Sequence, residues 1–313
     1  MRLCRIGPEH APRAAFYDEK RIVPIADAAA AFKRATGETL DLPGDDLLRL
    51  LPGGDSYSAV AKLAESLSSK PQEGIDPAKV ELLVPIPKPN KIFLLAGNYA
   101  EHIKEGGGVA AERAETFPYV FMKPPTTTLN HPSKPVIIPK VSPGAIDWEL
   151  ELAVVIGKKC KGVSEADALK YVAGYTIIND ISNRKFRPNP GRKKRDKDTF
   201  FDWLHGKWHD SFCPCGPCIV SADEIPDPQS LPMKLTLNGQ TRQDANTSMM
   251  IFPVAAVIEF ISAMVTLEPG DIISTGTPSG VGNTTGTYLK PGDVMHGTIG
   301  SVGTLITVMR SEE

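Results

Sequence analysis

Hydrophobic and polar residues alternate most strictly between residues 147 and 157. The apolar positions of this segment are Trp148, Leu150, Leu152, Val154 and Ile156. A repeat of two residues predicts a β-strand whose apolar face packs against the core. The opposite face begins with three carboxylates, Asp147, Glu149 and Glu151. The pattern therefore places a row of like charges on a core strand.

This row of carboxylates has two interpretations. Neighbouring acids on one face of a strand are about 6–7 Å apart along the backbone. At about 5 Å and an effective dielectric of 20, two sheltered carboxylates repel each other by roughly 3 kcal/mol. A bound divalent cation would remove this repulsion. The alternative is the solvent-exposed face of an antiparallel strand.

A further acidic residue, Asp180, follows a second predicted strand. Residues 175–180 read Tyr-Thr-Ile-Ile-Asn-Asp, and a short predicted helix that starts at Ser164 precedes them. A strand that returns after such a crossover can lie beside the first one. We therefore expect Asp180 near Glu149 and Glu151.

A histidine and a glutamate are spaced for one face of a helix. Residues 99–105 follow a buried strand pattern at 91–96 and contain His102 and Glu105. Side chains three positions apart on a helix are neighbours. A carboxylate beside an imidazole raises its basicity, as a general base requires. The alternative is a solvated ion pair. Glycines at 106–108 would let this segment move as a lid.

The rest of the pattern predicts an α+β, β-rich protein of two domains. Residues 1–85 are expected to form a small N-terminal accessory domain, with a hairpin at 14–25 and a helix at 26–36. Alternating prolines at 85, 87 and 89 exclude a helix and mark the boundary to a second domain at 86–313. The 28 prolines and 27 glycines indicate many turns between short strands.

Composition excludes several kinds of partner. The formal net charge of -2 argues against a nucleic-acid binder. No apolar run approaches the length of a membrane span, and the first residues lack a secretory signal. Five cysteines, with Cys4 and Cys160 isolated, fit a reducing compartment. A cytoplasmic location is therefore expected.

A basic segment follows Asp180. Its cations are Arg184, Lys185, Arg187, Arg192, Lys193, Lys194, Arg195 and Lys197. The segment is either a solvated loop or a cationic rim that attracts an anionic substrate.

Two further motifs suggest binding chemistry. His209 with Cys213, Cys215 and Cys218 offers four zinc ligands, but the spacing is atypical, so buried free thiols are the preferred interpretation. Residues 275–282 are rich in glycine but lack the Gly-Lys-Ser/Thr ending of a phosphate loop. Free backbone amides and hydroxyls in that loop are suited to holding a carboxylate.

Five motifs, in this order, resemble the catalytic domain of the fumarylacetoacetate hydrolase (FAH) family. They are Asp-Trp-Glu-Leu-Glu-Leu-Ala-Val-Val-Ile-Gly at 147–157, Gly-Tyr-Thr-Ile-Ile-Asn-Asp at 174–180, Phe-Cys-Pro-Cys-Gly-Pro at 212–217, Thr-Leu-Glu-Pro-Gly-Asp at 266–271 and Thr-Gly-Thr-Pro-Ser-Gly-Val-Gly at 275–282. The resemblance covers about residues 91–309. It implies an FAH-like fold of rolled, largely antiparallel sheets, a homodimer, and a Mg²⁺ site, with Mn²⁺ or Ca²⁺ as alternative ions.

The resemblance also implies roles for individual residues. The metal ligands would be Glu149, Glu151 and Asp180, with Asp147 nearby. The catalytic residues would be His102 and Glu105, which activate water, and Lys207, which faces the substrate. The substrate-binding candidates are Lys123, Arg184, Gln243 and Thr277.

These roles predict a Mg²⁺-dependent hydrolase that cleaves a carbon–carbon bond of an acylpyruvate or similar 1,3-dicarbonyl keto acid through an enolate. A decarboxylase, an isomerase or hydratase, and a lyase can use the same enolate, so these activities stay open. A non-catalytic binding protein is a further alternative. Its basis is the segment 182–187, which reads Ser-Asn-Arg-Lys-Phe-Arg where many members have Ser-Ala-Arg-Asp-x-Gln.

Overall fold

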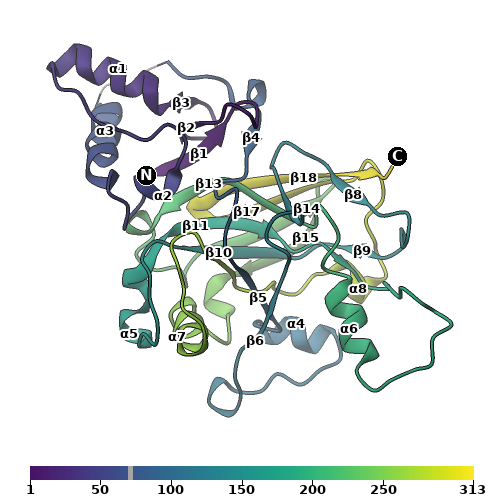
Figure 1. Ribbon diagram of the computed structural model, residues 1–313. Helices are drawn as coiled ribbons and strands as arrows, with labels where there is room; N and C mark the ends of the chain where they lie inside the picture. Colours follow the sequence, from purple (N-terminus) through teal and green to yellow (C-terminus); the bar gives the residue numbers. More distant parts are fainter. Residues whose placement is uncertain (70–72) are drawn as a thin grey trace.

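Two strands that are buried along their whole length form the centre of a large mixed sheet (Figure 1). The computed structural model describes residues 1–69 and 73–313. Strands β10 (Leu150–Ile156) and β11 (Val172–Asn179) pair antiparallel, with Leu150 opposite Asn179. Within the described residues the order of this sheet is β3-β2-β1-β13-β11-β10-β16-β5-β6, with β4 beside β1 and β7 beside β13.

The remaining strands of this sheet are short, except for β13, which has nine residues. They are β1 (Arg2–Ile6), β2 (Arg13–Tyr17), β3 (Ile22–Pro24), β4 (Leu82–Leu83), β5 (Ile92–Ala96), β6 (Tyr119–Met122), β7 (Leu129–Asn130), β13 (Cys213–Ser221) and β16 (Ile272–Ser274). Most pairs are antiparallel, but β16 pairs parallel with β5 and β7 pairs parallel with β13.

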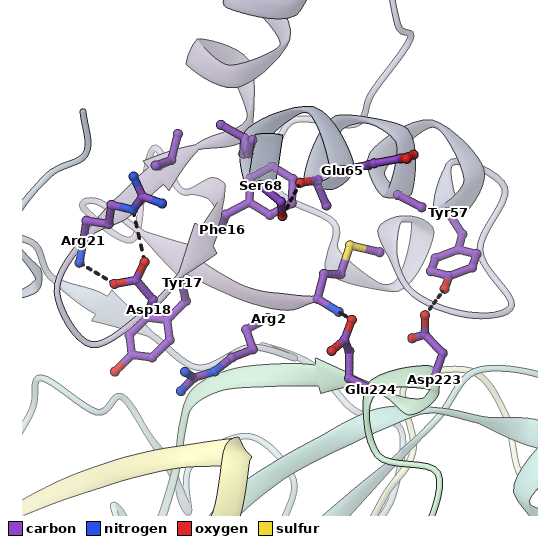
Figure 2. Close-up of a pocket in the computed structure, with 15 residues that line it drawn as sticks. Arg2, Phe16, Tyr17, Asp18, Arg21, Tyr57, Glu65, Ser68, Asp223 and Glu224 are labelled. Carbon is purple, nitrogen blue, oxygen red and sulfur yellow. Dashed lines mark hydrogen bonds and ion pairs between the residues drawn. The ribbon is translucent and has the colours of Figure 1, made fainter. Parts of the chain in front are cut away.

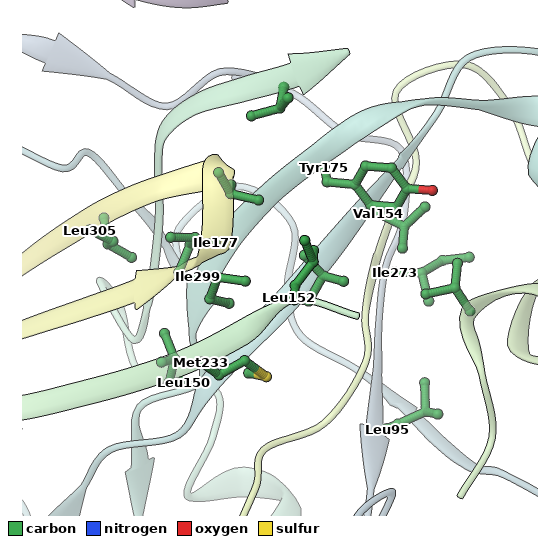
Figure 3. Packing of buried hydrophobic residues seen from close by; sticks show 14 of the residues in the cluster. Leu95, Leu150, Leu152, Val154, Tyr175, Ile177, Met233, Ile273, Ile299 and Leu305 are labelled. Atoms are coloured by element: carbon green, nitrogen blue, oxygen red, sulfur yellow. The ribbon is translucent and has the colours of Figure 1, made fainter. Parts of the chain in front are cut away.

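A second sheet packs against one face of the first. Its order is β15 (Gln240–Asn246), β14 (Pro232–Leu237), β17 (Val294–Ile299), β18 (Gly303–Ser311) and β8 (Val136–Ile138). Figure 3 shows side chains from both sheets meeting between them. Leu150, Leu152 and Ile177 from the large sheet contribute to the same core as Met233 and Ile299 from the second.

The helices flank the sheets without covering the second sheet completely, because alternate residues of β14, β17 and β18 are exposed or partly exposed. They are α1 (Ile25–Thr36), α2 (Leu47–Leu50), α3 (Tyr57–Ser69), α4 (Ala100–Glu105), α5 (Glu165–Ala168), α6 (Asp198–His205), α7 (Val254–Met264) and α8 (Gly282–Thr285). Ala153 and Val155 of β10 belong to a second buried cluster that includes Phe32 of α1 and Val60 of α3. Because both faces of β10 are covered, every residue of this strand is buried.

The acidic segment differs from the prediction in two ways. Strand β9 (Ile146–Asp147) pairs with β12 (Ser182–Asn183), and β10 begins only at Leu150, so the predicted continuous strand is interrupted. At the interruption the Glu149 amide donates to the Asn179 side chain, at 3.0 Å, and not to a strand backbone. The solvent-exposed interpretation of the carboxylate row is wrong, since Asp147, Glu149 and Glu151 are all buried.

The N-terminal predictions agree with the structure at the level of elements. The hairpin is β2 and β3, and the helix is α1. Strand β1 pairs with β13, so this region extends the large sheet. The division into domains 1–85 and 86–313 stays a prediction. The predicted class, α+β and β-rich with several sheets, is confirmed. No helix of the described residues has the length and hydropathy needed to cross a membrane.

Candidate active site

Three carboxylates from the central strands converge on one point. Glu149 precedes β10, Glu151 lies within it, and Asp180 follows β11. Each offers an oxygen, and these oxygens all lie within 4.8 Å of one another. Among the described residues this is the group of acids, histidines or cysteines arranged to hold a metal ion. The antiparallel pairing of β10 with β11 places Asp180 beside the two glutamates, as the sequence predicted.

A buried ammonium neutralises part of this charge. Lys207 Nζ donates to Glu149 Oε2 at 2.8 Å, to Asp180 Oδ2 at 2.5 Å and to Ser182 Oγ at 2.9 Å. The same ammonium lies 5.2 Å from the ring centre of Phe121 and 5.4 Å from that of Trp203. Burial disfavours the charge on Lys207, but attraction to Asp180 and Glu149 raises its pKa above the usual value.

Two further cations, Arg184 and Lys123, pair with acids of this cluster. Arg184 donates through Nε to Asp147 Oδ2 at 2.8 Å and through a terminal nitrogen to Glu149 Oε1 at 2.5 Å. Lys123 Nζ lies 2.5 Å from Asp180 Oδ1, as an ion pair without hydrogen-bond geometry, and donates to two backbone carbonyls. Four carboxylates thus face three cations, so the ionised cluster keeps one surplus negative charge.

Glu151 is the carboxylate of this cluster that forms no ion pair with a described cation. Burial raises the pKa of Glu151 well above its usual value, and repulsion from Asp180 and Glu149 adds to this effect. Burial also opposes ionisation of Glu149, but the attraction of Lys207 and Arg184 outweighs it and lowers the pKa of that carboxyl. Burial raises the pKa of Asp147, against the opposing effect of Arg184. Glu149 therefore stays charged, while Glu151 has no ion-pair partner in the described part of the chain.

The cluster fits a hard divalent cation. Glu151 Oε2 accepts hydrogen bonds from Ser274 Oγ at 2.6 Å and from the Gly276 amide at 3.0 Å. Its other oxygen, Oε1, is buried and has no hydrogen-bond partner among the described residues. An orphaned oxygen beside two further carboxylates matches the all-oxygen ligand sets of Mg²⁺ and Mn²⁺.

The glycine-rich loop does hold carboxylates, but they belong to the protein itself. The Gly276 amide binds Glu151, and the Gly280 amide donates to Glu105 Oε2 at 2.9 Å. The Gly282 amide donates to Asp147 Oδ1 at 2.6 Å. The loop therefore orients three acids of the site. Its donors are backbone amides, so these hydrogen bonds do not depend on the loop's side chains. The sequence-based expectation that the loop holds a carboxylate agrees with these contacts, and substrate binding by the same loop stays a prediction.

The predicted histidine–glutamate pair is present. His102 Nδ1 lies 2.7 Å from Glu105 Oε1 on helix α4. Because the carboxylate accepts the Nδ1 proton, Nε2 is left as the acceptor in the neutral ring. Asn98 anchors the start of this helix, since its side chain exchanges hydrogen bonds with Phe252 and donates to the Thr275 carbonyl.

A cavity of about 180 Å³ is lined by residues of both the histidine–glutamate pair and the acidic cluster. Its polar lining residues are His102, Glu149, Arg184, Lys207 and Thr277. Leu95, Phe121 and Trp203 supply apolar walls. A small molecule in this cavity can contact His102, Lys207 and the Glu149 member of the acidic cluster.

Comparison with known proteins agrees with this geometry. Residues 91–310 match the family model described as fumarylacetoacetate (FAA) hydrolase C-terminal. The chain belongs to the fumarylacetoacetate hydrolase family.

Relatives within the FAH family are enzymes. The chain is 43% identical over 224 residues to a 2,4-didehydro-3-deoxy-L-rhamnonate hydrolase of a Sphingomonas species, covering 71% of this chain and 73% of that protein. It is 38% identical over 277 residues to the mitochondrial oxaloacetate tautomerase fahd2 of Xenopus laevis, covering 86% and 82%. The prediction of an enzyme is confirmed, and the non-catalytic alternative is set aside.

A solved FAH-family structure matches along the full chain. Maleylpyruvate hydrolase from Sphingobium sp. SYK-6, in complex with manganese(II) ion and pyruvate, superimposes with a TM-score of 0.73. The two chains are 30% identical, and the match covers 100% of each. The predicted family and fold are thus confirmed.

Two substrate-binding candidates lie outside the cavity of this FAH-family site. Gln243 accepts from the Leu150 amide at 3.1 Å and donates to Thr277 Oγ1 and the Pro278 carbonyl, both at 2.8 Å. These bonds tie β15 to β10 and to the glycine-rich loop. Lys123 is buried behind Asp180. Direct substrate contact by Gln243 or Lys123 stays a prediction, whereas Thr277 and Arg184 line the cavity.

Sequence reasoning missed several residues of the site. Ser182 binds Lys207, Ser274 binds Glu151, and Trp203 forms a wall of the cavity. Trp203 lies on helix α6, which follows the basic segment and which the sequence analysis did not predict. The apolar positions 200, 201, 203 and 204 of that helix are the signal that would have indicated an amphipathic segment.

The cysteine cluster is structural. All five cysteines are buried and free, and Cys213, Cys215 and Cys218 lie on strand β13. Burial raises the pKa of Cys213 to about 12 and that of Cys218 to about 11. Protonated thiols on a core strand favour the preferred interpretation over a zinc site.

A larger cavity lies apart from the acids. About 550 Å³ in volume, it is lined by residues of the N-terminal region and by the segment after β13 (Figure 2). Its polar walls are already paired: Tyr57 Oη donates to Asp223 Oδ2 at 2.6 Å, and Arg21 pairs with Asp18. None of the three clustered carboxylates lines it, so its size does not make it the active site.

Replacing Lys207 by methionine is expected to destabilise the metal-free protein by about 3–5 kcal/mol, because Glu149 and Asp180 lose a buried partner. Added Mn²⁺ should recover much of that loss by supplying the missing positive charge. Urea unfolding with and without Mn²⁺ measures both effects. Equal stability of variant and parent without metal would contradict the charge balance described above.

Proposed function

We propose that this FAH-family enzyme is a divalent-cation-dependent hydrolase that cleaves a carbon–carbon bond of an acylpyruvate or similar 1,3-dicarbonyl keto acid. The observation that supports it most is the cavity lined by His102, Lys207 and Glu149. His102 is paired with Glu105, and Lys207 binds the clustered acids Glu149 and Asp180. A general base, a cation for developing negative charge and a metal site are the three components such a cleavage requires.

The relatives support keto acids as the substrate class. Their names describe a hydrolase of a didehydro-deoxy sugar acid, a tautomerase of oxaloacetate and a hydrolase of maleylpyruvate. The last of these holds manganese and pyruvate in its crystal structure. We infer that the present chain also acts on a small anionic keto acid.

Glu149, Glu151 and Asp180 would hold the ion, and we propose Mg²⁺ as the resident metal, with Mn²⁺ as a substitute. The ion supplies Lewis-acid stabilisation of negative charge on the keto-acid oxygens. Lys207 Nζ now lies between Glu149 and Asp180. With the ion bound, the lysine is expected to turn part of its hydrogen bonding toward the substrate, because the carboxylates then have a second cationic partner.

The proton chemistry follows from helix α4. Glu105 accepts the Nδ1 proton of His102, and the Gly280 amide fixes Glu105 in turn. His102 Nε2 is therefore the site that removes a proton from water. The water oxygen bonds to the carbonyl carbon distal to the carboxylate, and the resulting alkoxide collapses to a carboxylic acid.

Collapse breaks the bond between the acyl carbon and the methylene carbon. The bonding electrons pass into a pyruvate enolate, whose negative charge is stabilised by the Lys207 ammonium. The His102 imidazolium then returns its proton to the enolate carbon, directly or through water. The products are pyruvate and the acid derived from the acyl group, and His102 is neutral again.

Keto–enol tautomerisation of oxaloacetate or a related acid is the second candidate, because a tautomerase is 38% identical to the chain. It needs the same enolate and proton carrier but no attacking water. The same base and cation can serve hydrolysis and tautomerisation. The structure of the substrate then determines which of the two reactions occurs.

A substrate screen tests the proposal. Acylpyruvates and oxaloacetate would be offered with Mg²⁺, with Mn²⁺ and with excess chelator. We expect metal-dependent release of pyruvate from at least one acylpyruvate, measured by coupling to lactate dehydrogenase. Tautomerisation of oxaloacetate without pyruvate release would select the second candidate. Failure of every keto acid to react with either metal, or equal rates in chelator, would reject the proposed activity.

Location and assembly complete the proposal. Five free, buried cysteines fit a reducing compartment, so we propose the cytoplasm. The family resemblance supports a homodimer.

A further inference from the structure

A second cavity adjoins the candidate active site on the side of the basic segment. It has a volume of about 480 Å³ and lies between the loop that follows β12 and helix α6. Arg184 and Trp203 line both this cavity and the catalytic one. The two cavities are therefore neighbours that share these two side chains as a common wall. In Figure 1 the loop projects outward beside α6.

The loop around this cavity is anchored at several points. Arg192 donates to Asp198 at 3.0 Å and to Asp202 at 2.5 Å, which fastens the loop to helix α6. Nearer its start, the Phe186 ring packs edge-on against His209 at 4.9 Å, and Lys185 lies over the ring of Tyr288. The cavity walls are thus positioned by the fold.

The charges in the cavity do not cancel. Its two carboxylates, Asp198 and Asp202, are both paired with Arg192. Arg184 is paired with Asp147 and Glu149. Arg187 and Lys194 also line the cavity, are exposed, and form no ion pair with any described residue. Two uncompensated cations therefore face a cavity that shares the Arg184 and Trp203 side chains with the catalytic one.

We propose that Arg187 and Lys194 bind a distal carboxylate, so that the preferred substrate is a dicarboxylic keto acid. The keto-acid end occupies the catalytic cavity, and the second carboxylate reaches the two cations past Arg184 and Trp203. This inference rests on the proposed function, because it assumes that the catalytic cavity takes a keto acid. It adds a second binding site and a substrate class to that function.

Binding of matched keto acids tests the inference without requiring turnover. The pairs are 2-oxoglutarate with 2-oxopentanoate, 2-oxoadipate with 2-oxohexanoate, and 2-oxopimelate with 2-oxoheptanoate. Each pair has one chain length and differs in the terminal carboxylate. Calorimetry on the full chain with Mn²⁺ should show, for at least one length, about tenfold tighter binding of the diacid.

The variants separate local contacts from general charge. The double variant Arg187→Gln/Lys194→Gln should lose the preference for the diacid and keep its affinity for the monoacid. The control Lys193→Gln/Lys197→Gln removes the same charge from exposed residues of the same segment that do not line the cavity. It should keep the preference.

The possible results are distinct. Equal binding of diacid and monoacid at all three lengths, or the same loss in both double variants, overturns the distal site and leaves the proposed function standing. Absence of binding by all six keto acids rejects the proposed function and this inference together.

Discussion

Replacing Glu151 by glutamine is expected to abolish metal-dependent turnover, with less than about 1% of the activity remaining, because one of three anionic ligands becomes neutral. The affinity for Mn²⁺ should fall by about 100-fold or more, which calorimetry measures directly. Glutamine preserves the shape of the side chain. Its amide oxygen can still accept the hydrogen bonds that Ser274 and Gly276 now donate.

The metal-free Glu151→Gln protein should unfold at the same urea concentration as the parent or at a higher one. The substitution removes a buried carboxylate that Asp180 and Glu149 repel, so loss of activity would not reflect misfolding. Glu38→Gln is a suitable control, since Glu38 is exposed and pairs with Lys62 in the N-terminal region. Full activity or unchanged Mn²⁺ affinity in Glu151→Gln would count decisively against the metal site.

Replacing His102 by alanine is the second change with a large expected effect. Loss of the general base should lower kcat by about 100-fold or more. Affinity for Mn²⁺ should be unchanged, because His102 belongs to the cavity lining and not to the cluster of carboxylates. Steady-state kinetics with the best acylpyruvate from the screen, together with calorimetry, separates the two effects.

His296→Ala is the matched control for this variant. His296 is an exposed histidine on β17, in the second sheet, and it does not line the catalytic cavity. Its replacement should leave kcat within about twofold of the parent. If His102→Ala retained the parent rate, the base assigned to the reaction would be wrong, although the acidic cluster could still hold a metal.

Much of the site was predictable because its candidate residues are spaced at the repeat of a strand or of a helix. Alternation at residues 147–157 indicated a core strand with acids on it, and the spacing of His102 and Glu105 indicated a pair on one helical turn. Both features depend on residues within a few positions of one another. Local geometry determines them wherever the segment lies in the fold. The exact strand bounds were not predictable, since β10 begins only at Leu150 and the Glu149 amide before it binds the Asn179 side chain.

The sequence by itself determined the family, most of the strands and helices around the site, and the residues proposed to bind a metal or act as a base. Only the tertiary structure decided how the buried charges balance, with Lys207, Lys123 and Arg184 against four acids. It also showed that the glycine-rich loop binds the protein's own carboxylates and that two cavities meet at Trp203. These features join segments many residues apart, and such contacts arise from sheet pairing and packing, which no local periodicity encodes.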